Sequence, residues 1–309
     1  MNPQILHDIS RRLESVIRGK PEAVELLLIA LAGGGHVLIE DVPGVGKTTL
    51  AKTLATAVQA EFRRVQFTPD LLPTDITGGM VYSSATGEFS FRPGPVFCNL
   101  LLADEINRAS PRTQSALLEA MNERQVSIDG RRYPLPEPFM VIATQNPVEY
   151  HGTYPLPEAQ LDRFLLRFSI GYPAEADELV ILRDRQREMN PAVVTATATA
   201  ADVADMQSAV GMVGVEESVR SYIAGLVRAT RKEPRIRLGA SPRAALALQR
   251  ACQARAWLKG RPAVLPDDVK ALAGPVLAHR LLLESGTAFA GGQSEQVVAD
   301  LLRSLPAPV

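Results

Sequence analysis

Short, continuous apolar runs alternate with helical patterns along the first part of the chain. Strand-like runs occupy His36–Glu40, Asn99–Ala103 and Phe139–Thr144. Continuous apolar runs of this length are typical of parallel strands that are buried on both faces. Between them, the spacing of apolar residues predicts helices over Thr48–Gln59 and Arg112–Glu123. Strands that alternate with helices predict an α/β fold, in which helices cover a parallel sheet.

Two segments interrupt this alternation, and both have the pattern of a β-hairpin. Met80–Phe97 has two short alternating arms around Ser84–Gly87, followed by a return that is rich in Pro and Gly. Val126–Pro138 contains an Asp-Gly turn at residues 129–130, which is a strong short-range hairpin signal. Each hairpin is either a surface decoration or an insertion that contacts a partner, and the pattern leaves both interpretations open.

The pattern changes after Tyr172, where the strand signal ends. Glu216–Ala229 predicts a helix with one core-facing side, because its apolar residues recur at helical spacing: Val219, Tyr222, Ile223, Leu226 and Val227. Two more helices are expected at Ser241–Leu258 and Pro266–Leu283, and the low-complexity stretch Thr195–Ala201 is expected to be a flexible join. We therefore predict a core domain over residues 1–172, with hairpin inserts near 80–97 and 126–138, and an all-helical domain over residues 173–309.

Composition and charge narrow the class of protein. The 33 basic and 34 acidic residues leave a net charge of −1, which counts against constitutive nucleic-acid binding. The N-terminal stretch has no secretory-signal pattern, and no run approaches the ~18 apolar residues of a membrane span. Cys98 and Cys252 have no partner spacing, so we expect buried thiols in a reducing cytoplasm. The histidines are scattered, and we expect them on the surface or in loops: His7, His36, His151 and His279.

A glycine-rich loop follows the first strand-like run and opens a helix. Glu40–Thr49 reads EDVPGVGKTT, in the strand–loop–helix context that a phosphate-binding loop needs. The glycines of Gly44–Gly46 let backbone N–H groups turn inward around phosphate oxygens. Lys47 would supply a positive charge to the β- and γ-phosphates, and the Thr48 hydroxyl suits Mg²⁺. Asp41 stands where the strict pattern has glycine; because Asp tolerates unusual φ angles, we still expect the loop to form.

Two adjacent carboxylates follow the second strand-like run. Asn99–Glu105 reads NLLLADE, and the carboxyl ends of parallel strands face the ligand crevice of an open sheet. Asp104 suits a partner of Mg²⁺, and Glu105 suits the base that orients an attacking water. Asn146 ends the third run with an uncharged amide that could hydrogen-bond the γ-phosphate or this water. A turn-forming Asn before proline is the competing interpretation.

Two arginines are candidates for stabilising charge on a transferred phosphoryl group. Arg243 follows Ser241 and Pro242, which have the pattern of an N-cap and a first helical residue. A cation in the first turn opposes the helix dipole, so contact with phosphate explains Arg243 better than local stability does. Arg163 is the second candidate, and an ion pair with a neighbouring acid is an equally open interpretation.

Together these residues resemble the AAA+ superfamily and, within it, the MoxR family. The resemblance covers nearly the whole chain and is most specific over Ala143–Leu166, which reads ATQNPVEYHGTYPLPEAQLDRFLL. By this resemblance Gly44–Thr48 matches the Walker A motif, Asp104–Glu105 matches Walker B, and Asn146 matches sensor 1. Val16–Gly19 is similar to the segment that lines the adenine. The resemblance implies an α/β fold: a P-loop αβα sandwich with a parallel sheet, followed by an all-helical lid domain.

The resemblance also implies roles for the remaining residues. Arg163 takes the role of the arginine finger that reaches the ATP of a neighbouring subunit, and Arg243 takes that of sensor 2. The two hairpins coincide with the helix-2 insert and the pre-sensor-1 hairpin of this group, and Asp41 is tolerated in the family. Thr48 and Asp104 are the implied Mg²⁺ residues. The implied ATP-binding residues are Ile17, Gly19, Pro43, Gly44, Val45, Gly46, Lys47, Thr48 and Thr49.

Partners and activity follow from the same resemblance. A finger that acts in trans implies a homo-oligomer, expected to be a hexameric ring. Members of the MoxR family resemble chaperones that mature other complexes, often with a partner that bears a von Willebrand factor A domain. The expected activity is therefore hydrolysis of Mg-ATP that drives remodelling of client proteins.

Three other activities remain open at this stage. A metal-insertion motor of the magnesium-chelatase type shares the same inserts. A DNA-handling or transcription-activating ATPase would predict a basic stripe, for which Arg131-Arg132 is the only suggestive pair. A nucleotide switch without hydrolysis is disfavoured because both Glu105 and Asn146 are present.

Overall fold

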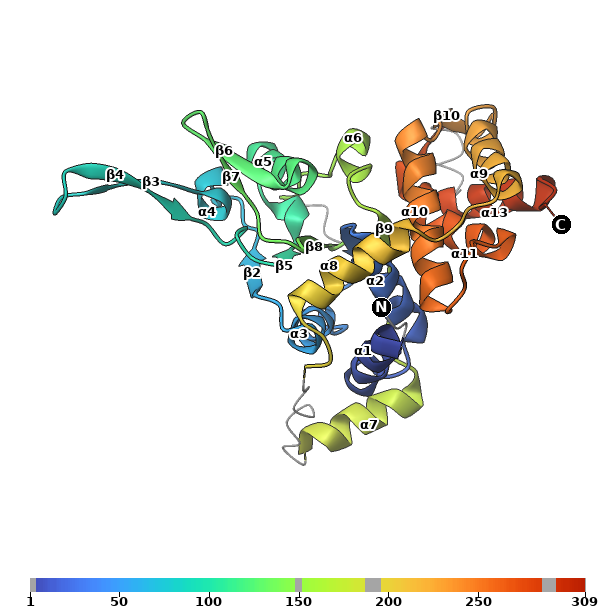
Figure 1. Ribbon diagram of the computed structural model, residues 1–309, viewed down its shortest axis with the longest axis horizontal. Helices are drawn as coiled ribbons and strands as arrows, with labels where there is room; N and C mark the ends of the chain where they lie inside the picture. The colour runs from blue at the N-terminus through green and yellow to red at the C-terminus, as the bar shows by residue number, and fades with distance from the viewer. Residues whose placement is uncertain (1–3, 148–151, 187–195, 285–292, 309) are drawn as a thin grey trace.

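The computed structural model describes residues 4–147, 152–186, 196–284 and 293–308, and a five-stranded sheet lies at its centre (Figure 1). All neighbouring strands are parallel, in the order β2–β5–β8–β1–β9. Because the strands share one direction, their carboxyl ends lie at one edge of the sheet, the carboxyl edge, and their amino ends at the other, the amino edge. The strands are β1 (Val37–Glu40), β2 (Phe62–Gln66), β5 (Leu100–Asp104), β8 (Met140–Gln145) and β9 (Leu166–Phe168).

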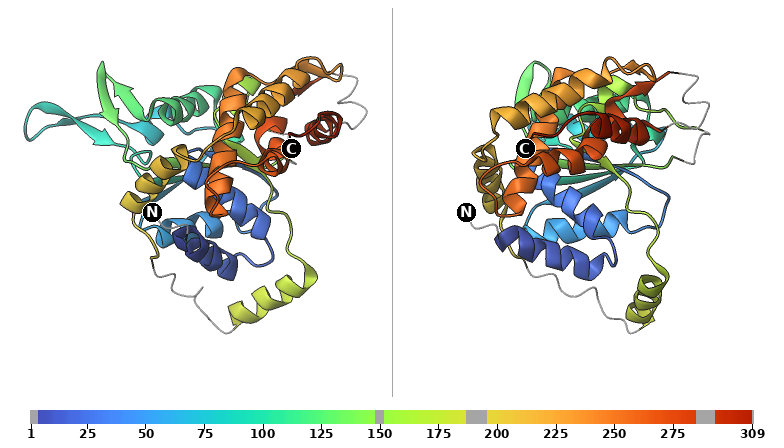
Figure 2. Two further views of the ribbon diagram at one scale, coloured as in Figure 1. Left: turned by 45° about the vertical axis from the view of Figure 1, so that its right-hand side comes forward. Right: turned by 90° about the vertical axis from the view of Figure 1, so that its right-hand side faces the viewer.

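Alternating side chains bury both faces of this sheet. Leu100 and Leu102 pack into one apolar cluster with the first three helices, whereas Leu101 and Ala103 pack into the cluster on the other face. Figure 2 shows the N-terminal helices, in blue, gathered on one side of the sheet. The predicted αβα sandwich is therefore confirmed. The helices are α1 (Gln4–Val16), α2 (Pro21–Gly33) and α3 (Lys47–Ala57) on one face, and α4 (Pro73–Thr77) and α5 (Pro111–Glu123) on the other.

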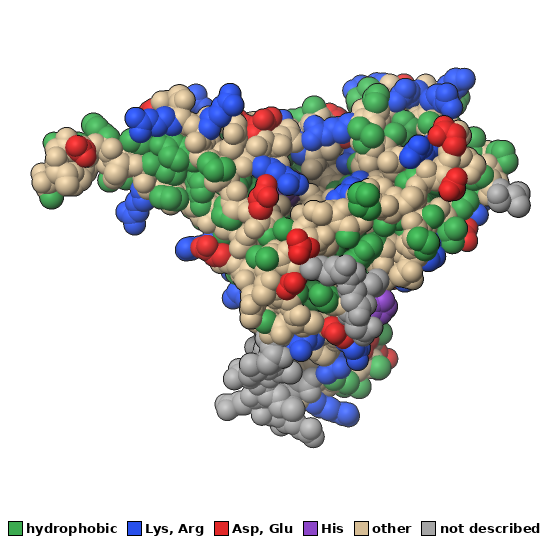
Figure 3. All heavy atoms as spheres, viewed as in Figure 1, with side chains coloured by type: hydrophobic (Ala, Val, Ile, Leu, Met, Phe, Trp, Pro, Cys, Tyr) green, Lys and Arg blue, Asp and Glu red, His purple; other side chains and the backbone are tan. Residues whose placement is uncertain are grey.

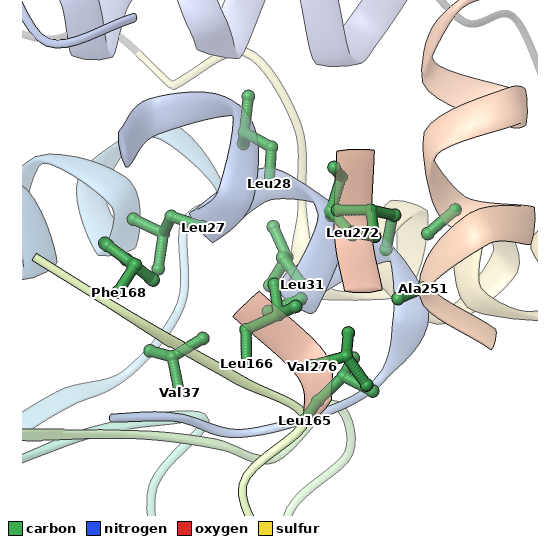
Figure 4. Close-up of a cluster of buried hydrophobic side chains, with 14 of the residues drawn as sticks. Leu27, Leu28, Leu31, Val37, Leu165, Leu166, Phe168, Ala251, Leu272 and Val276 are labelled. Atoms are coloured by element: carbon green, nitrogen blue, oxygen red, sulfur yellow. The ribbon is translucent and has the colours of Figure 1, made fainter. Parts of the chain in front are cut away.

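Helix α2 is buried over most of its surface, because it lies between the sheet and the C-terminal helices. Figure 4 shows Leu27 and Leu31 of α2 among side chains from β1 and β9 and from helices more than 200 residues further along the chain, including Leu272. Gly34, in the left-handed conformation at φ 69°, ends the helix. The core and the C-terminal helices thus share one hydrophobic cluster. Its C-terminal members come mainly from α8 (Ala200–Gly211), α9 (Glu217–Thr230), α10 (Pro242–Leu258) and α11 (Pro266–Leu277).

The C-terminal region is helical, as predicted, apart from one short antiparallel ribbon. Strands β10 (Ile236–Leu238) and β11 (Leu282–Leu283) form this ribbon. The helix expected to continue to Leu283 ends at Leu277 instead, because the chain enters the 3₁₀ turn η2 (Ala278–Arg280) and then pairs with β10. The region also contains α13 (Ser294–Ser304), and α7 (Glu175–Gln186) precedes it. The domain boundary at residue 172 stays a prediction.

Both predicted hairpins are confirmed, and they contact each other. The first consists of β3 (Gly78–Ser83) and β4 (Glu88–Pro93), and it projects far from the rest of the molecule (Figure 1). The second consists of β6 (Gln125–Ile128) and β7 (Arg131–Pro134). The rings of Phe91 and Tyr133 stack at a centroid distance of 4.0 Å, which joins the two hairpins.

His7 is exposed and His36 lies in the loop before β1, as expected, although His36 is buried. His279 was expected on the surface or in a loop, but it is buried in the 3₁₀ turn η2. His151 lies outside the described residues. The expected flexible join also differs: Thr195 lies outside the described residues, but the backbone N–H groups of residues 197 and 198 both donate to the Ala57 carbonyl. This segment is therefore tied to the end of α3 before α8 begins.

The expectation that the cysteines are buried thiols is confirmed. Cys98 and Cys252 are both buried and free. Burial raises the pKa of both thiols, that of Cys98 to about 12, so both are inert at neutral pH. Among the described residues, no helix is both long enough and apolar enough to cross a lipid bilayer.

Candidate functional site

The glycine loop lies at the carboxyl edge of the sheet, where β1 ends and α3 begins. Gly44 and Gly46 adopt φ angles of 89° and 92°, in the region that favours glycine. A Cβ atom on Gly44 would meet nothing within 4 Å, so backbone conformation, rather than crowding, is the reason for glycine there. Gly46 is also the N-cap of α3, which directs free N–H groups and the positive end of the helix dipole toward this loop.

Lys47 is the first residue of α3, and its ammonium folds back over the loop. Its Nζ donates to the carbonyls of Asp41 and Val42 at 2.7 and 3.1 Å. Burial lowers the pKa of Lys47, while the charges of Asp41, Asp104 and Glu105 oppose this shift. The charges of Asp104 and Glu105 therefore favour the charged form of this lysine.

The structure explains why Asp stands at position 41, and the explanation is not the unusual φ angle that we expected. Its φ angle is not positive, and its side chain is buried. Oδ2 accepts hydrogen bonds from the backbone N–H groups of Ile170 and Gly171, both at 2.7 Å, and from the Ser169 hydroxyl at 3.2 Å. Oδ1 accepts from the N–H of Val42 at 3.0 Å. Asp41 thus fastens the start of the glycine loop to the segment after β9, which a glycine could not do.

The two acids lie directly at the end of β5 and are fixed by the neighbouring strand β8. The Thr144 hydroxyl donates to Asp104 Oδ1 at 2.6 Å and accepts from the backbone N–H of Glu105 at 2.9 Å. Glu105 has the left-handed φ of 56°, which costs about 1–3 kcal/mol for a residue with a side chain. This conformation turns the Glu105 side chain away from the regular alternation of the strand.

Sequence reasoning missed three side chains that hold these acids. Arg64, on β2, donates from Nε and Nη2 to Asp104 Oδ2 at 3.2 and 2.7 Å. The Gln66 amide donates to Glu105 Oε2 at 2.9 Å, and Arg108 Nε lies 3.1 Å from the same oxygen. Strand β2 was not recognised because its arginines interrupt the apolar run. The alternation of residues 64 and 66 on one side of it was the available signal.

Asn146 follows β8, which lies between β5 and β1 in the sheet. Its side chain is buried, so the sheet order places this amide at the carboxyl edge between the acids and the loop. Ile17 is close as well, because a Cβ on Gly46 would lie 3.6 Å from Ile17 Cδ1. Gly19 has a φ of 67°, which side chains rarely adopt, and it lies beside the Asp177 carboxylate.

The donor set at the carboxyl edge fits Mg²⁺ with a nucleotide. Asp104, Glu105 and the Thr48 hydroxyl are hard oxygen donors of the kind that Mg²⁺ prefers. In the described part of the chain, no group of three or more His, Cys, Asp or Glu side chains could hold a metal alone. A site of this kind suits Mg²⁺, because this ion keeps several waters and also binds substrate phosphates.

The structure does not bring Arg163 and Arg243 to Lys47. Arg163 precedes β9, and Arg243 donates from Nη2 to the Asn122 side chain at 2.8 Å, near the end of α5. Helix α5 starts beyond the carboxyl end of β5 and returns toward the amino edge. Both arginines therefore lie at the amino edge, opposite the glycine loop. Arg243, which we expected to contact phosphate, therefore lies away from the glycine loop of its own chain.

A hollow at the amino edge collects positive charge. It is lined by loop residues 33–36 before β1, by the end of α5 and by the start of α10, and its charged side chains are Arg124, Arg163, Arg243, Arg250, Arg280 and Asp162. Asp162 pairs with Arg280 at 2.7 Å, and burial and the charge of Arg243 lower the pKa of Arg163. Figure 3 shows Lys and Arg side chains around a hollow between the hairpin side and the lid. This surface is suited to an anion.

Two family models match the chain. The model described as "ATPase family associated with various cellular activities (AAA)" matches residues 36–166, and the model of the AAA lid domain matches residues 228–301. The first range contains the glycine loop, both acids, Asn146 and Arg163. The second contains Arg243.

Relatives of known sequence match nearly the full chain. YeaC of Bacillus subtilis is 47% identical, with 96% of this chain and 93% of YeaC covered. Chaperone MoxR1 of Mycobacterium tuberculosis is 43% identical, with 90% of this chain and 76% of MoxR1 covered. A crystal structure of a protein from Cytophaga hutchinsonii is 39% identical at a TM-score of 0.92, with 99% and 96% of the two chains covered. The glycine loop, the paired acids and these relatives together show that the chain belongs to the MoxR family of AAA+ ATPases.

Proposed function

We propose that this protein hydrolyses Mg-ATP at the carboxyl edge of its sheet and uses the free energy to remodel partner proteins. The observation that carries the proposal is that the glycine loop with Lys47 and the acids Asp104 and Glu105 lie at the same edge of the sheet. A cation in the phosphate loop that faces two carboxylates is the arrangement that phosphoryl transfer from ATP requires.

In this proposal each residue at the carboxyl edge has a separate role. The loop N–H groups and Lys47 bind the triphosphate, and Ile17 and Gly19 would line the adenine side of the nucleotide. Thr48 and Asp104 would hold Mg²⁺, which when bound offsets charge on the phosphates. Glu105 orients the attacking water and accepts its proton, while Asn146 positions that water without adding negative charge.

The amino edge presents further cations, which a neighbouring subunit could use. Arg163 and Arg243 lie together there, so one subunit presents both to the nucleotide of the next subunit. Preorganised cations at the γ-phosphoryl group stabilise the charge that spreads over it in the transition state. Hydrolysis then needs a ring, and the proposed assembly is a homo-hexamer that closes head to tail.

The remodelling role rests on the relatives and on the hairpins. One relative is named a chaperone, and the β3–β4 hairpin projects from the body with exposed Tyr82 and Phe89. Exposed aromatic side chains on a projecting element are suited to contact another protein. By family resemblance, a protein with a von Willebrand factor A domain is the proposed class of client.

The test uses Glu105→Gln, which keeps the size of the side chain and removes the base. We expect phosphate release to fall by about 10²–10⁴-fold, while a fluorescent ATP analogue still binds. The matched control is Glu217→Gln, an exposed residue at the start of α9, which should leave phosphate release unchanged. If Glu105→Gln releases phosphate at the rate of the unmodified protein, Glu105 is not the base and this mechanism is wrong.

A further inference from the structure

Arg64 is placed to control the charge of Asp104. Its Nε and Nη2 both donate to Oδ2 of that carboxylate, and Nη2 also donates to the side-chain amide oxygen Oε1 of Gln66 at 3.0 Å. The other carboxylate oxygen accepts the Thr144 hydroxyl. One side of Asp104 is therefore fixed by a neutral donor, and the other side is neutralised by a cation.

The two members of this ion pair differ in their freedom to move. The Asp104 side chain is 12% exposed, whereas that of Arg64 is 46% exposed. The carboxylate is held within the sheet edge by β8, but the guanidinium can rotate into solvent on a long, flexible side chain. A partly solvated pair of this kind is weak, so the arginine can be displaced from the acid.

We propose that Arg64 is a positioning residue that neutralises Asp104 in the nucleotide-free chain and competes with Mg²⁺ for this carboxylate. Two cations repel each other at one carboxylate, so the guanidinium must withdraw when the metal enters. A free divalent cation that displaces Arg64 gains only the Asp104 carboxylate as a ligand. A cation that arrives with a triphosphate is also bound by the phosphate oxygens, so its total binding free energy is larger. Arg64 thereby makes metal binding depend on nucleotide. The inference rests on the proposed function, because that function assigns Mg²⁺ to Asp104.

The test compares Arg64→Gln with Arg63→Gln, a matched variant on the same strand. Arg63 points to the other side and pairs with exposed Glu61 at 2.7 Å, so its replacement removes the same charge without touching Asp104. The first measurement is Mn²⁺ affinity without nucleotide, by electron paramagnetic resonance. The second is the Mg²⁺ concentration at half-maximal binding of a fluorescent ATP analogue.

We expect Arg64→Gln to bind Mn²⁺ about two- to fivefold more tightly and to lower the Mg²⁺ midpoint by a similar factor. Arg63→Gln should match the unmodified protein in both measurements. Arg64→Lys keeps the charge but loses the two-donor contact, so its Mn²⁺ affinity and Mg²⁺ midpoint should lie between those of Arg64→Gln and Arg63→Gln. Arg64→Lys replaces Arg64→Gln in the test if Arg64→Gln does not fold. Equal values for all variants, or weaker metal binding by Arg64→Gln, would overturn the proposal.

The two proposals fail in different ways. If the unmodified protein binds no ATP analogue, the proposed function is wrong, yet the nucleotide-free Mn²⁺ comparison still reports on Arg64 and Asp104. If the analogue binds but the Arg64 variants do not differ from the control, only the role of Arg64 is refuted.

Discussion

The two edges of the sheet carry opposite chemistry. The carboxyl edge presents backbone N–H groups, Lys47 and the acids Asp104 and Glu105, a set that binds phosphate and a hard metal ion. The amino edge presents a hollow in which Arg163 and Arg243 are neighbours. Glu105 and the two arginines therefore lie at opposite edges of the sheet. If the proposed function is right, Glu105 and the arginines of one chain serve different nucleotides.

The largest expected effect comes from Arg163 at the amino edge. Arg163→Ala should lower phosphate release by about 10³-fold or more, because an arginine that acts in trans contributes 10³–10⁵ to the rate. Binding of a fluorescent ATP analogue should persist. Arg112→Ala, an exposed arginine on α5, is the matched control and should have no effect.

Replacing Arg243 tests whether the arginines at the amino edge act on the nucleotide of a neighbouring subunit. Arg243→Ala should cost about 10²-fold in phosphate release, since it removes one preorganised donor. When the Arg243→Ala and Glu105→Gln proteins are mixed, the mixture should regain part of the activity. Some interfaces then combine the intact Glu105 of one subunit with the intact Arg243 of its neighbour. If Arg243 served its own chain, mixing would restore nothing. Arg237→Ala, exposed in the same region, should behave like the unmodified protein.

At the carboxyl edge, Asp41→Gly tests the anchor of the loop. Restoring the glycine of the strict motif should lower the free energy of unfolding by about 2–3 kcal/mol, since the N–H groups of Ile170 and Gly171 lose a charged acceptor. Chemical denaturation measures this change. Asp129→Gly is the matched control: residue 129 has φ 49°, where glycine is favoured, so stability should not fall. Unchanged stability of Asp41→Gly would show that the anchor is dispensable.

The smallest expected effect is the pH dependence of stability that comes from His36, which lines the amino-edge hollow. His36 is buried; its Nδ1 accepts from the Val141 N–H, and its Nε2 contacts the Met121 carbonyl. Burial lowers the pKa of His36 from 6.5 to about 4. The unfolded chain therefore binds a proton at a higher pH than the folded chain does, and stability falls as the pH drops from 6.5 toward 4. Between pH 8 and pH 5 this contribution amounts to about 2 kcal/mol.

Thermal unfolding at several pH values checks this expectation. His36→Gln should reduce the loss of stability on acidification, although it removes a buried ring and lowers stability at pH 8. Burial also lowers the pKa of His279, so part of the acid sensitivity should remain in this variant. An equal loss for both proteins between pH 8 and pH 5 would assign the effect to other groups.

Local sequence patterns predicted most of the core. The apolar runs that became β1, β5 and β8 were found to within one residue at each end, because buried parallel strands leave a continuous signal. Strand β2 was not predicted, because Arg63 and Arg64 interrupt its apolar pattern. Only the structure shows the ion-pair partners of these arginines, which are Glu61 and Asp104 respectively. The buried position of His36 left no local signal either, since its partners are 85 and 105 residues away.

The sequence by itself determined the chemistry of the carboxyl edge: glycines that permit left-handed backbone, a lysine that opens a helix, and acids at the end of an apolar strand. These are local properties, because a few consecutive residues set backbone freedom and strand burial. Only the tertiary structure decided where Arg163 and Arg243 lie and what Asp41 and Arg64 hold. Those contacts depend on which edge of the sheet each connection returns to, and the order of the strands, not the spacing of residues, fixes that.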